Sequence, residues 1–403
     1  MGTPEPLLFR CARWLTFASA VTILVSIAAS QILLALALAA LLLSGGRMRL
    51  PRIWLPLSLF LVGTLLSLAL SPDPAAGLPQ VRKIFVFTIL LLVFSTLRDA
   101  RTIRWLFLCW AGAGAIISLR GFVQFGRKVQ EAHAAGQSFY DYYVGERITG
   151  FMSHWMTFGG QEMIAFLMTA AFLFFACIHR KRAWIWFTCT LLMAVALLLG
   201  FTRSIWLASA GAGAYLLWFW KRWIAMAVPV VLLLIALLAP ASIRERFSSM
   251  LRPGKIDSNQ HRIVTWRTGL EMIRTHPWFG LGPEEVKLQF NRYVPADIPR
   301  PLPEGWYGHL HNIYLQYAAE RGIPTMLTML WMLILILYDC CRRAWRLPPG
   351  RTDQKFVLHG TAAVVIATMI AGCFEYNLGD SEVLTMFLVV VGCAYAAMES
   401  AVA

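Results

Sequence analysis

Long apolar runs alternate with short polar segments along nearly the whole chain, and this pattern predicts membrane-spanning helices. Most of the runs are long enough to cross a ~30 Å hydrocarbon layer as a helix. Backbone groups in lipid must be satisfied within their own segment, which favours helices. We therefore predict about twelve transmembrane helices, the first two sharing a polar hinge at Ser30 and Gln31: 14–29, 31–44, 53–71, 82–97, 104–124, 157–178, 184–200, 205–220, 223–240, 323–341, 356–374 and 383–400.

One long polar segment, about residues 241–322, interrupts this pattern before the last three runs. Within it we expect short helices at Thr265–Thr275, Glu284–Tyr293 and His311–Arg321, the last ended by Gly322. Apolar residues make up 58% of the 403 residues, more than a soluble domain needs for its core. The expected fold class is therefore all-α: one polytopic membrane domain, residues 1–403, with 241–322 as a large outward loop.

Basic residues set the expected orientation. Half of the 36 lysines and arginines flank alternate ends of the predicted spans, and short basic loops stay in the cytoplasm. Both termini are then cytoplasmic. Because this bias explains most of the +15 net charge, the charge is weak evidence for nucleic-acid binding, and we expect membrane lipid but no nucleic acid as a partner.

The eight cysteines agree with this orientation, since all of them fall in spans or at cytoplasmic ends. The sequence contains no C-x-x-C or HExxH motif and no His/Cys cluster at metal spacing. We therefore expect neither a metal site nor a cofactor.

Polar residues that topology does not explain gather on the outward side. Arg147 and His154 lie in 125–156, and Arg203 lies in the tight turn 200–204. The long outward loop and the acidic loop 375–382 carry the others: Arg262, Arg267, His309, His311, Glu375, Asp380 and Glu382. Any one of these arginines could simply anchor a helix end among lipid headgroups, and His154 could pack against Trp155.

His311 is expected in the first turn of a helix, where the helix dipole disfavours a protonated imidazole and leaves the ring able to accept a proton. A single histidine in such a position is more often an ordinary surface residue. Two further charges lie inside the membrane, Arg120 in the fifth span and Glu162 in the sixth. Ionisable groups at this depth are usually paired or functional, so these two either pair with each other or contact a charged substrate.

Four sequence motifs in order resemble the bacterial O-antigen ligase and Wzy-type polymerase superfamily. They are RITGFMSHWMTFGG from Arg147, the TRS turn with Arg203, HRIVTWRTGLEMIRTHPWFGLGP with Arg262 and Arg267, and the stretch HN-x9-G-x-x-T from His311 to Thr325. Together with the twelve spans and the large loop, the resemblance covers nearly the whole chain.

This resemblance implies a metal-independent, inverting glycosyl transfer on the periplasmic face of the bacterial inner membrane. The donor would be a glycan on undecaprenyl diphosphate, and for a ligase the acceptor would be a sugar hydroxyl of lipid A-core in lipopolysaccharide. His311 would accept the hydroxyl proton, and Arg203 and Arg262 would stabilise the diphosphate. Further substrate contacts are assigned to six residues: Arg147, His154, Arg267, Arg120, Glu162 and Asn312.

Two other functions stay open. A Wzy-type polymerase performs the same chemistry on a glycan acceptor, and the motifs do not define the acceptor; family members that attach glycans to proteins would look similar too. A polysaccharide transporter or flippase also suits twelve spans. Transporters, however, show paired halves and charges near the middle of the membrane. Here the unexplained charges cluster on the outward side, which argues against transport.

Overall fold

The computed structural model describes residues 6–177, 181–238, 240–241, 244 and 258–399. Within these ranges every regular element is a helix, as expected for an all-α fold. The first half contains α1 (Leu7–Thr22), α2 (Ile27–Leu43), α3 (Trp54–Ala69), α4 (Pro74–Arg82), the 3₁₀ helix η1 (Lys83–Phe87), α5 (Thr88–Thr96), α6 (Ala100–Ala134), α7 (Phe139–Gly145), α8 (Trp155–Phe175) and α9 (Ala183–Leu199). The second half contains α10 (Arg203–Leu238), α12 (Ser258–Thr275), α13 (Glu285–Tyr293), α14 (Ile313–Trp345), α15 (Thr352–Gly372), the 3₁₀ helix η2 (Asn377–Gly379) and α16 (Ser381–Glu399).

Six of these helical segments are long and apolar enough to cross a membrane: Pro74–Thr96, Ala100–Ala134, Trp155–Phe175, Ile313–Trp345, Thr352–Gly372 and Ser381–Glu399. Ile27–Leu43, Trp54–Ala69 and Ala183–Leu199 are apolar but shorter. The chain is therefore a multi-pass membrane protein. The count of twelve spans stays a prediction, although α10 contains two of the predicted runs, which are separated by the non-helical backbone of Lys221 (φ −147°, ψ 96°).

The expected hinge between the first two runs is wrong. The break between α1 and α2 falls before Ser26, whose side chain accepts a hydrogen bond from the backbone N–H of Ala29 and so caps α2. Ser30 instead lies inside α2, buried, and its hydroxyl donates to the carbonyl of Ser19 at 2.9 Å. Ser26 therefore marks the start of α2, whereas Ser30 forms its hydrogen bond with a residue of α1.

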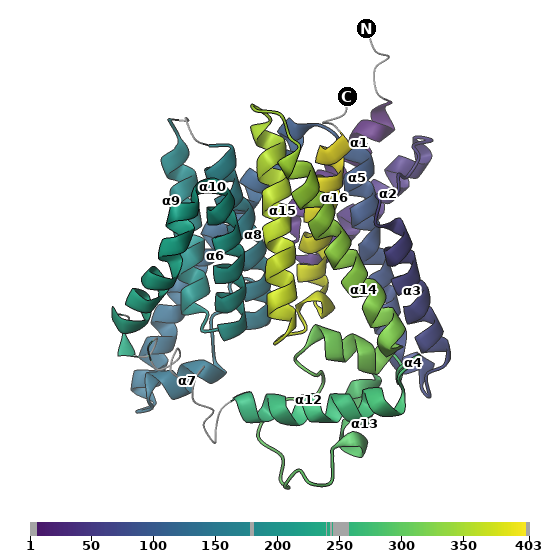
Figure 1. The fold of residues 1–403 in the computed structure, drawn as a ribbon, viewed down its shortest axis with the longest axis vertical. Helices are drawn as coiled ribbons and strands as arrows, with labels where there is room; N and C mark the ends of the chain where they lie inside the picture. Colours follow the sequence, from purple (N-terminus) through teal and green to yellow (C-terminus); the bar gives the residue numbers. More distant parts are fainter. Residues whose placement is uncertain (1–5, 178–180, 239, 242–243, 245–257, 400–403) are drawn as a thin grey trace.

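Figure 1 shows the helices running side by side, with α12 and α13 lying across one end of the bundle. The start of α1 and the end of α16 lie at the opposite end. Of the short helices expected in the long loop, α13 is confirmed within one residue, and α12 begins before the expected Thr265. The third is continuous with α14 except at Gly322, where φ is +82°.

A backbone contact joins the loop after α12 to α14 at this interruption. The N–H groups of Leu281 and Gly282 donate to the carbonyls of Ala319 and Glu320, both at 2.9 Å, and the N–H of Ile323 donates to the carbonyl of Pro277 at 2.8 Å. A Cβ on Gly322 would lie 2.0 Å from the carbonyl oxygen of Trp278. Both the positive φ and this close approach therefore favour glycine at position 322. The backbone contact also fixes the position of α12 relative to the bundle.

The two ends of the bundle should react differently with an impermeant thiol reagent. In a cysteine-free background, Thr275→Cys at the end of α12 should be labelled from outside the cytoplasmic membrane, because positive residues concentrate at the other end of the bundle. Thr352→Cys, at the start of α15, should be labelled only after the membrane is permeabilised. Both side chains are exposed, so accessibility to the reagent is the only difference tested. The reverse labelling pattern would contradict the predicted orientation.

Candidate active site

A cavity of about 780 Å³ lies at the end of the bundle where α12 packs. Five separate stretches of the chain line it, within residues 147–157, 202–203, 261–262, 304–311 and 375–382. Residues far apart in the sequence therefore meet at one place. Five of the nine residues given a catalytic or substrate-binding role from the sequence line this cavity together: Arg147, His154, Arg203, Arg262 and His311.

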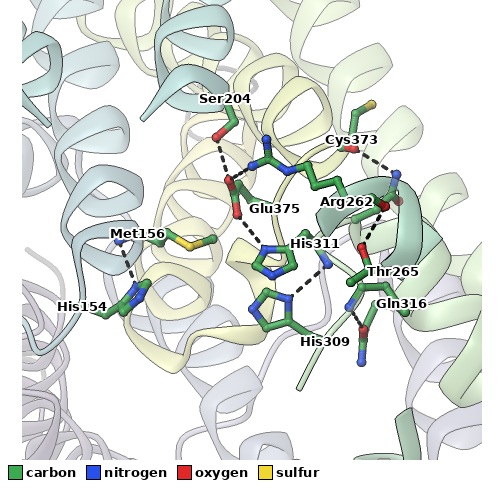
Figure 2. Close-up of polar contacts among 12 residues, drawn as sticks. His154, Met156, Ser204, Arg262, Thr265, His309, His311, Gln316, Cys373 and Glu375 are labelled. Carbon is green, nitrogen blue, oxygen red and sulfur yellow. Dashed lines mark hydrogen bonds and ion pairs between the residues drawn. The ribbon is translucent and has the colours of Figure 1, made fainter. Parts of the chain in front are cut away.

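The carboxylate of Glu375 lies at the centre of the polar contacts in this cavity (Figure 2). One oxygen accepts hydrogen bonds from the Arg262 guanidinium at 2.6 Å and from the Ser204 hydroxyl at 3.2 Å. The other oxygen lies 3.6 Å from Nδ1 of His311. Glu375 follows α15, Arg262 comes from α12 and His311 precedes α14, so one carboxylate joins three elements.

The environment keeps Glu375 ionised although its side chain is only 4% exposed. Burial by itself raises the pKa of a carboxyl group, but the contact with His311 and the positive charge of Arg262 outweigh it, so the pKa of Glu375 lies below its usual range. From the sequence, Glu375 was predicted to lie in an acidic outward loop, without a role in the site. The signal that could have identified it was an acidic residue on the same side as the unexplained arginines and histidines.

His311 has an unusual backbone. We expected it in the first helical turn, but it lies one residue before the N-cap residue of α14, with φ at +48°. Positive φ is uncommon for residues other than glycine and costs about 1–3 kcal/mol, and such strain concentrates at functional sites. The expected position in the first helical turn is therefore wrong, and the carboxylate of Glu375 lies 3.6 Å from Nδ1 of the ring.

Asn312 holds His311 in place and does not line the cavity. Its side-chain oxygen accepts hydrogen bonds from the N–H groups of Tyr314 and Leu315, which caps α14. Its side-chain nitrogen donates to the carbonyl of Cys373 at 3.0 Å, two residues before Glu375. Asn312 thus ties the start of α14 to the end of α15, the two segments that carry His311 and Glu375.

Two more histidines surround His311. The ring of His309 lies 4.0 Å from it and accepts a hydrogen bond from the His311 N–H through Nδ1, and the ring of His261 lies 5.2 Å away. Burial, reinforced by the nearby His311, lowers the pKa of His309 to about 3 and that of His261 to about 4. Both rings are therefore neutral at physiological pH.

Nε2 of His311 is buried and has no hydrogen-bond partner among the described residues. With Nδ1 directed to Glu375, Nε2 is the ring atom left to accept a proton. A carboxylate that orients an imidazole in this way holds the required tautomer and stabilises the charge that forms on protonation. The arrangement is suited to general-base chemistry.

Arg203 is the first residue of α10 and is only 8% exposed. It follows closely on Phe201, which also has positive φ (+50°), so the tight turn that presents Arg203 to the cavity is strained. An arginine that only anchored α10 among headgroups would be expected to stay exposed. Its burial at a cavity wall favours a role in the site.

Arg147 and His154 line the same cavity beside α8. The Arg147 guanidinium lies 5.2 Å from the centre of the Trp155 ring, a cation–π geometry. His154 caps α8 by accepting a hydrogen bond from the Met156 N–H at 3.2 Å, and its ring lies 4.1 Å from that of Trp155. His154 therefore has a structural task as well as access to the cavity, and burial lowers its pKa.

Three other candidates do not line the cavity. Arg267 forms an exposed ion pair with Asp297 at 2.8 Å. Arg120 donates to the carbonyl of Gly150 at 2.8 Å, and the described structure contains no ion pair between it and Glu162. Glu162 is 1% exposed, and neither of its oxygens has a hydrogen-bond partner among the described residues. The expected Arg120–Glu162 pair is wrong because a backbone carbonyl, not a carboxylate, lies next to the guanidinium.

The cavity combines three guanidinium groups with an oriented imidazole. The planar guanidinium group of an arginine can donate two parallel hydrogen bonds to two oxygens of one phosphate. Across the described ranges, no group of three or more His, Cys, Asp or Glu side chains is placed to hold a metal ion. The residues present can therefore bind a phosphorylated group and accept a proton beside it.

A multi-pass helical membrane protein with such a cavity at one end of its bundle fits the class of membrane enzymes that act on lipid-linked phosphorylated substrates. Residues 188–330 match the family model Wzy_C, described as O-antigen ligase. Over this segment the chain is similar to the O-antigen ligase family. Members of this family are glycosyltransferase-type membrane enzymes, ligases and polymerases, and the family implies a lipid-linked glycan.

The matched segment runs from α9 into α14 and contains Arg203, Arg262 and His311. Arg147, His154 and Glu375 lie outside it and join the site only through the fold. A comparison with curated proteins finds no match.

Proposed function

We propose that this protein is an O-antigen ligase. It transfers a glycan from undecaprenyl diphosphate to a sugar hydroxyl of lipid A-core, on the periplasmic face of the inner membrane and without a metal ion. The single observation that carries the proposal is the meeting of His311, Glu375 and three arginines in one cavity, within a chain that matches the ligase family. Both termini are then cytoplasmic.

The transfer is a single displacement. The acceptor hydroxyl oxygen bonds to the anomeric carbon of the glycan as the bond from that carbon to the diphosphate oxygen breaks, which inverts the anomeric configuration. The hydroxyl proton passes to Nε2 of His311, and Glu375 stabilises the resulting imidazolium through Nδ1. The electron pair leaves with undecaprenyl diphosphate.

The arginines stabilise this leaving group. Charge grows on the diphosphate as the bond to the sugar breaks, so preorganised donors there lower the barrier more than they stabilise bound substrate. Arg203 and Arg147 supply donors from the walls formed by α10 and the segment before α8. Arg262 supports Glu375 in the resting site and is the third guanidinium within the cavity.

The proposal is tested with purified protein in detergent, undecaprenyl-diphosphate glycan and lipid A-core. We expect glycan to appear on lipid A-core at an unchanged rate in EDTA, because arginines take the place of a divalent ion at the diphosphate. Loss of transfer in EDTA, with recovery on adding Mg²⁺, would contradict the metal-free mechanism. Transfer to a second lipid-linked glycan, with none to lipid A-core, would identify a polymerase instead.

Cells that lack the protein also distinguish a ligase from a polymerase, by the glycan that they accumulate. Loss of a ligase leaves lipid-linked polymer that never reaches lipid A-core. Loss of a polymerase leaves single repeat units attached to lipid A-core.

A further inference from the structure

A second cavity, of about 770 Å³, lies at the end of the bundle opposite the active site. It is formed where α8, α14 and the first part of α10 end and where α15 begins. The other ends of these same four helices bear or adjoin the active-site residues His154, Arg203, His311 and Glu375. The cavity is thus built by the elements that define the candidate active site, but at the opposite end of the bundle.

Aromatic rings form the walls of this second cavity. Phe174 stacks on Trp220 with ring centres 4.6 Å apart and planes 9° apart. Phe175 stacks on His359 at 4.5 Å with planes 19° apart. Trp345 also lines the cavity and is 84% exposed, as is usual for tryptophan at a membrane–water interface. Flat, rigid walls of this kind suit the packing of hydrocarbon chains.

Positive charge lines the mouth of the cavity. Lys221, Arg351 and Lys355 are among its lining residues, and no Asp or Glu is. The amine of Lys221 lies 4.8 Å from the centre of the Trp220 ring, and that of Lys355 lies 5.5 Å from the Phe175 ring. Each ammonium group therefore lies directly beside an aromatic wall.

The preference for positive charge at the cytoplasmic end explains why basic residues occur here, but not why three of them line one apolar cavity. Elsewhere at the same end, Arg52 pairs with Asp339 at 2.6 Å, Arg104 pairs with Asp353 at 2.9 Å, and Arg49 pairs with Glu399. Within the described ranges no ion pair involves any of the three cavity cations. Their uncompensated charge adjoins an apolar hollow, and an anionic amphiphile complements both.

We propose that this cavity binds an anionic phospholipid of the adjacent membrane leaflet. The phosphate lies between Lys221, Arg351 and Lys355, and the upper parts of the acyl chains lie along the Phe174–Trp220 and Phe175–His359 walls. The bound lipid contacts the ends of four helices, in addition to the hydrogen bonds that join Tyr215 to His359 and Cys341 there. It therefore stabilises the bundle that carries the active site.

The test measures lipid binding to the delipidated full-length protein by native mass spectrometry. We expect saturable binding of phosphatidylglycerol in preference to phosphatidylethanolamine. The double change Lys221→Gln and Lys355→Gln should raise the dissociation constant for phosphatidylglycerol about 30-fold, at ~1 kcal/mol for each basic residue near an anionic lipid. Both side chains are exposed, so the fold should survive the change. The unchanged protein should also melt at a higher temperature with phosphatidylglycerol than without it.

The matched control removes two charges from the same end of the bundle, away from the cavity. Arg47→Gln with Arg101→Gln, both exposed, should leave the dissociation constant within about twofold of the unchanged protein. Ala344→Phe, which fills the cavity without changing its charge, should weaken binding as the lysine changes do. An equal loss of phosphatidylglycerol binding in the lysine double variant and in the arginine double variant would overturn the proposal, because it would show a general effect of surface charge. Displacement of the lipid by millimolar inorganic phosphate would overturn it in favour of a site for soluble anions.

Discussion

Replacing His311 with alanine is expected to lower the rate of glycan transfer by roughly 10²–10⁴-fold, the usual contribution of a positioned base. A sugar hydroxyl is a poor nucleophile while it keeps its proton, and Nε2 of His311 is buried without a hydrogen-bond partner among the described residues. Donor binding should be nearly unchanged, because the proposed diphosphate contacts come from the arginines. The measurement is the rate of transfer to lipid A-core, with lipid-linked donor binding measured on the same preparation.

Two further changes separate this role from a merely structural one. His276→Ala removes an exposed histidine from the same outward region and should leave transfer within about twofold of normal. Glu375→Gln keeps the shape but removes the charge that orients His311, and should lower the turnover rate about 10- to 100-fold with little change in donor affinity. Normal transfer by the His311→Ala protein would exclude it as the base. Asp380 would then be the next candidate, because it lines the cavity and burial raises its pKa to about 6.

Replacing Arg203 with lysine should lower transfer by about 10²–10³-fold, as the loss of a preorganised donor does in other enzymes. Lysine keeps the positive charge but loses the planar fork that binds two phosphate oxygens together. Arg203→Ala should be at least as severe, and both changes should also weaken donor binding, unlike His311→Ala. The measurement is the dependence of the transfer rate on donor concentration.

Arg267 is the matched control for this second prediction. It is an arginine of the same matched segment, but it pairs with Asp297 on the exposed surface and does not line the cavity. Arg267→Ala should therefore change transfer less than about twofold. Full activity in both Arg203 variants would mean that Arg203 serves only to anchor the start of α10.

The residues of the site fall into two sets according to the part of the reaction on which they act. The base and its orienting carboxylate act on the acceptor, and the guanidinium groups act on the leaving group. Arg262 lies between the two sets, since it contacts Glu375 and lines the same cavity. Its loss should therefore affect both donor binding and turnover, with the unpaired Glu375 carboxylate adding to the damage.

Local pattern was sufficient for the all-helical class and for several of the elements. Apolar runs indicated a helical membrane protein because lipid permits few other backbone arrangements. The position of Gly322 indicated a break in α14, since a positive φ there is easy only for glycine. The break between α1 and α2 was misplaced because capping by Ser26 depends on one side chain, which a hydropathy pattern does not reveal.

By itself, then, the sequence determined the all-helical fold class and the segment that bears α12 and α13, because each depends on residues that are close together along the chain. It also predicted Arg203, Arg262 and His311 as site residues, and the structure places all three in one cavity. Only the tertiary structure decided which of the outward charges act together. It placed Glu375 between Arg262 and His311, and it left Arg267 on the surface. Such contacts join helix ends separated by up to hundreds of residues, and their partners are chosen by how the helices pack, which no local pattern records.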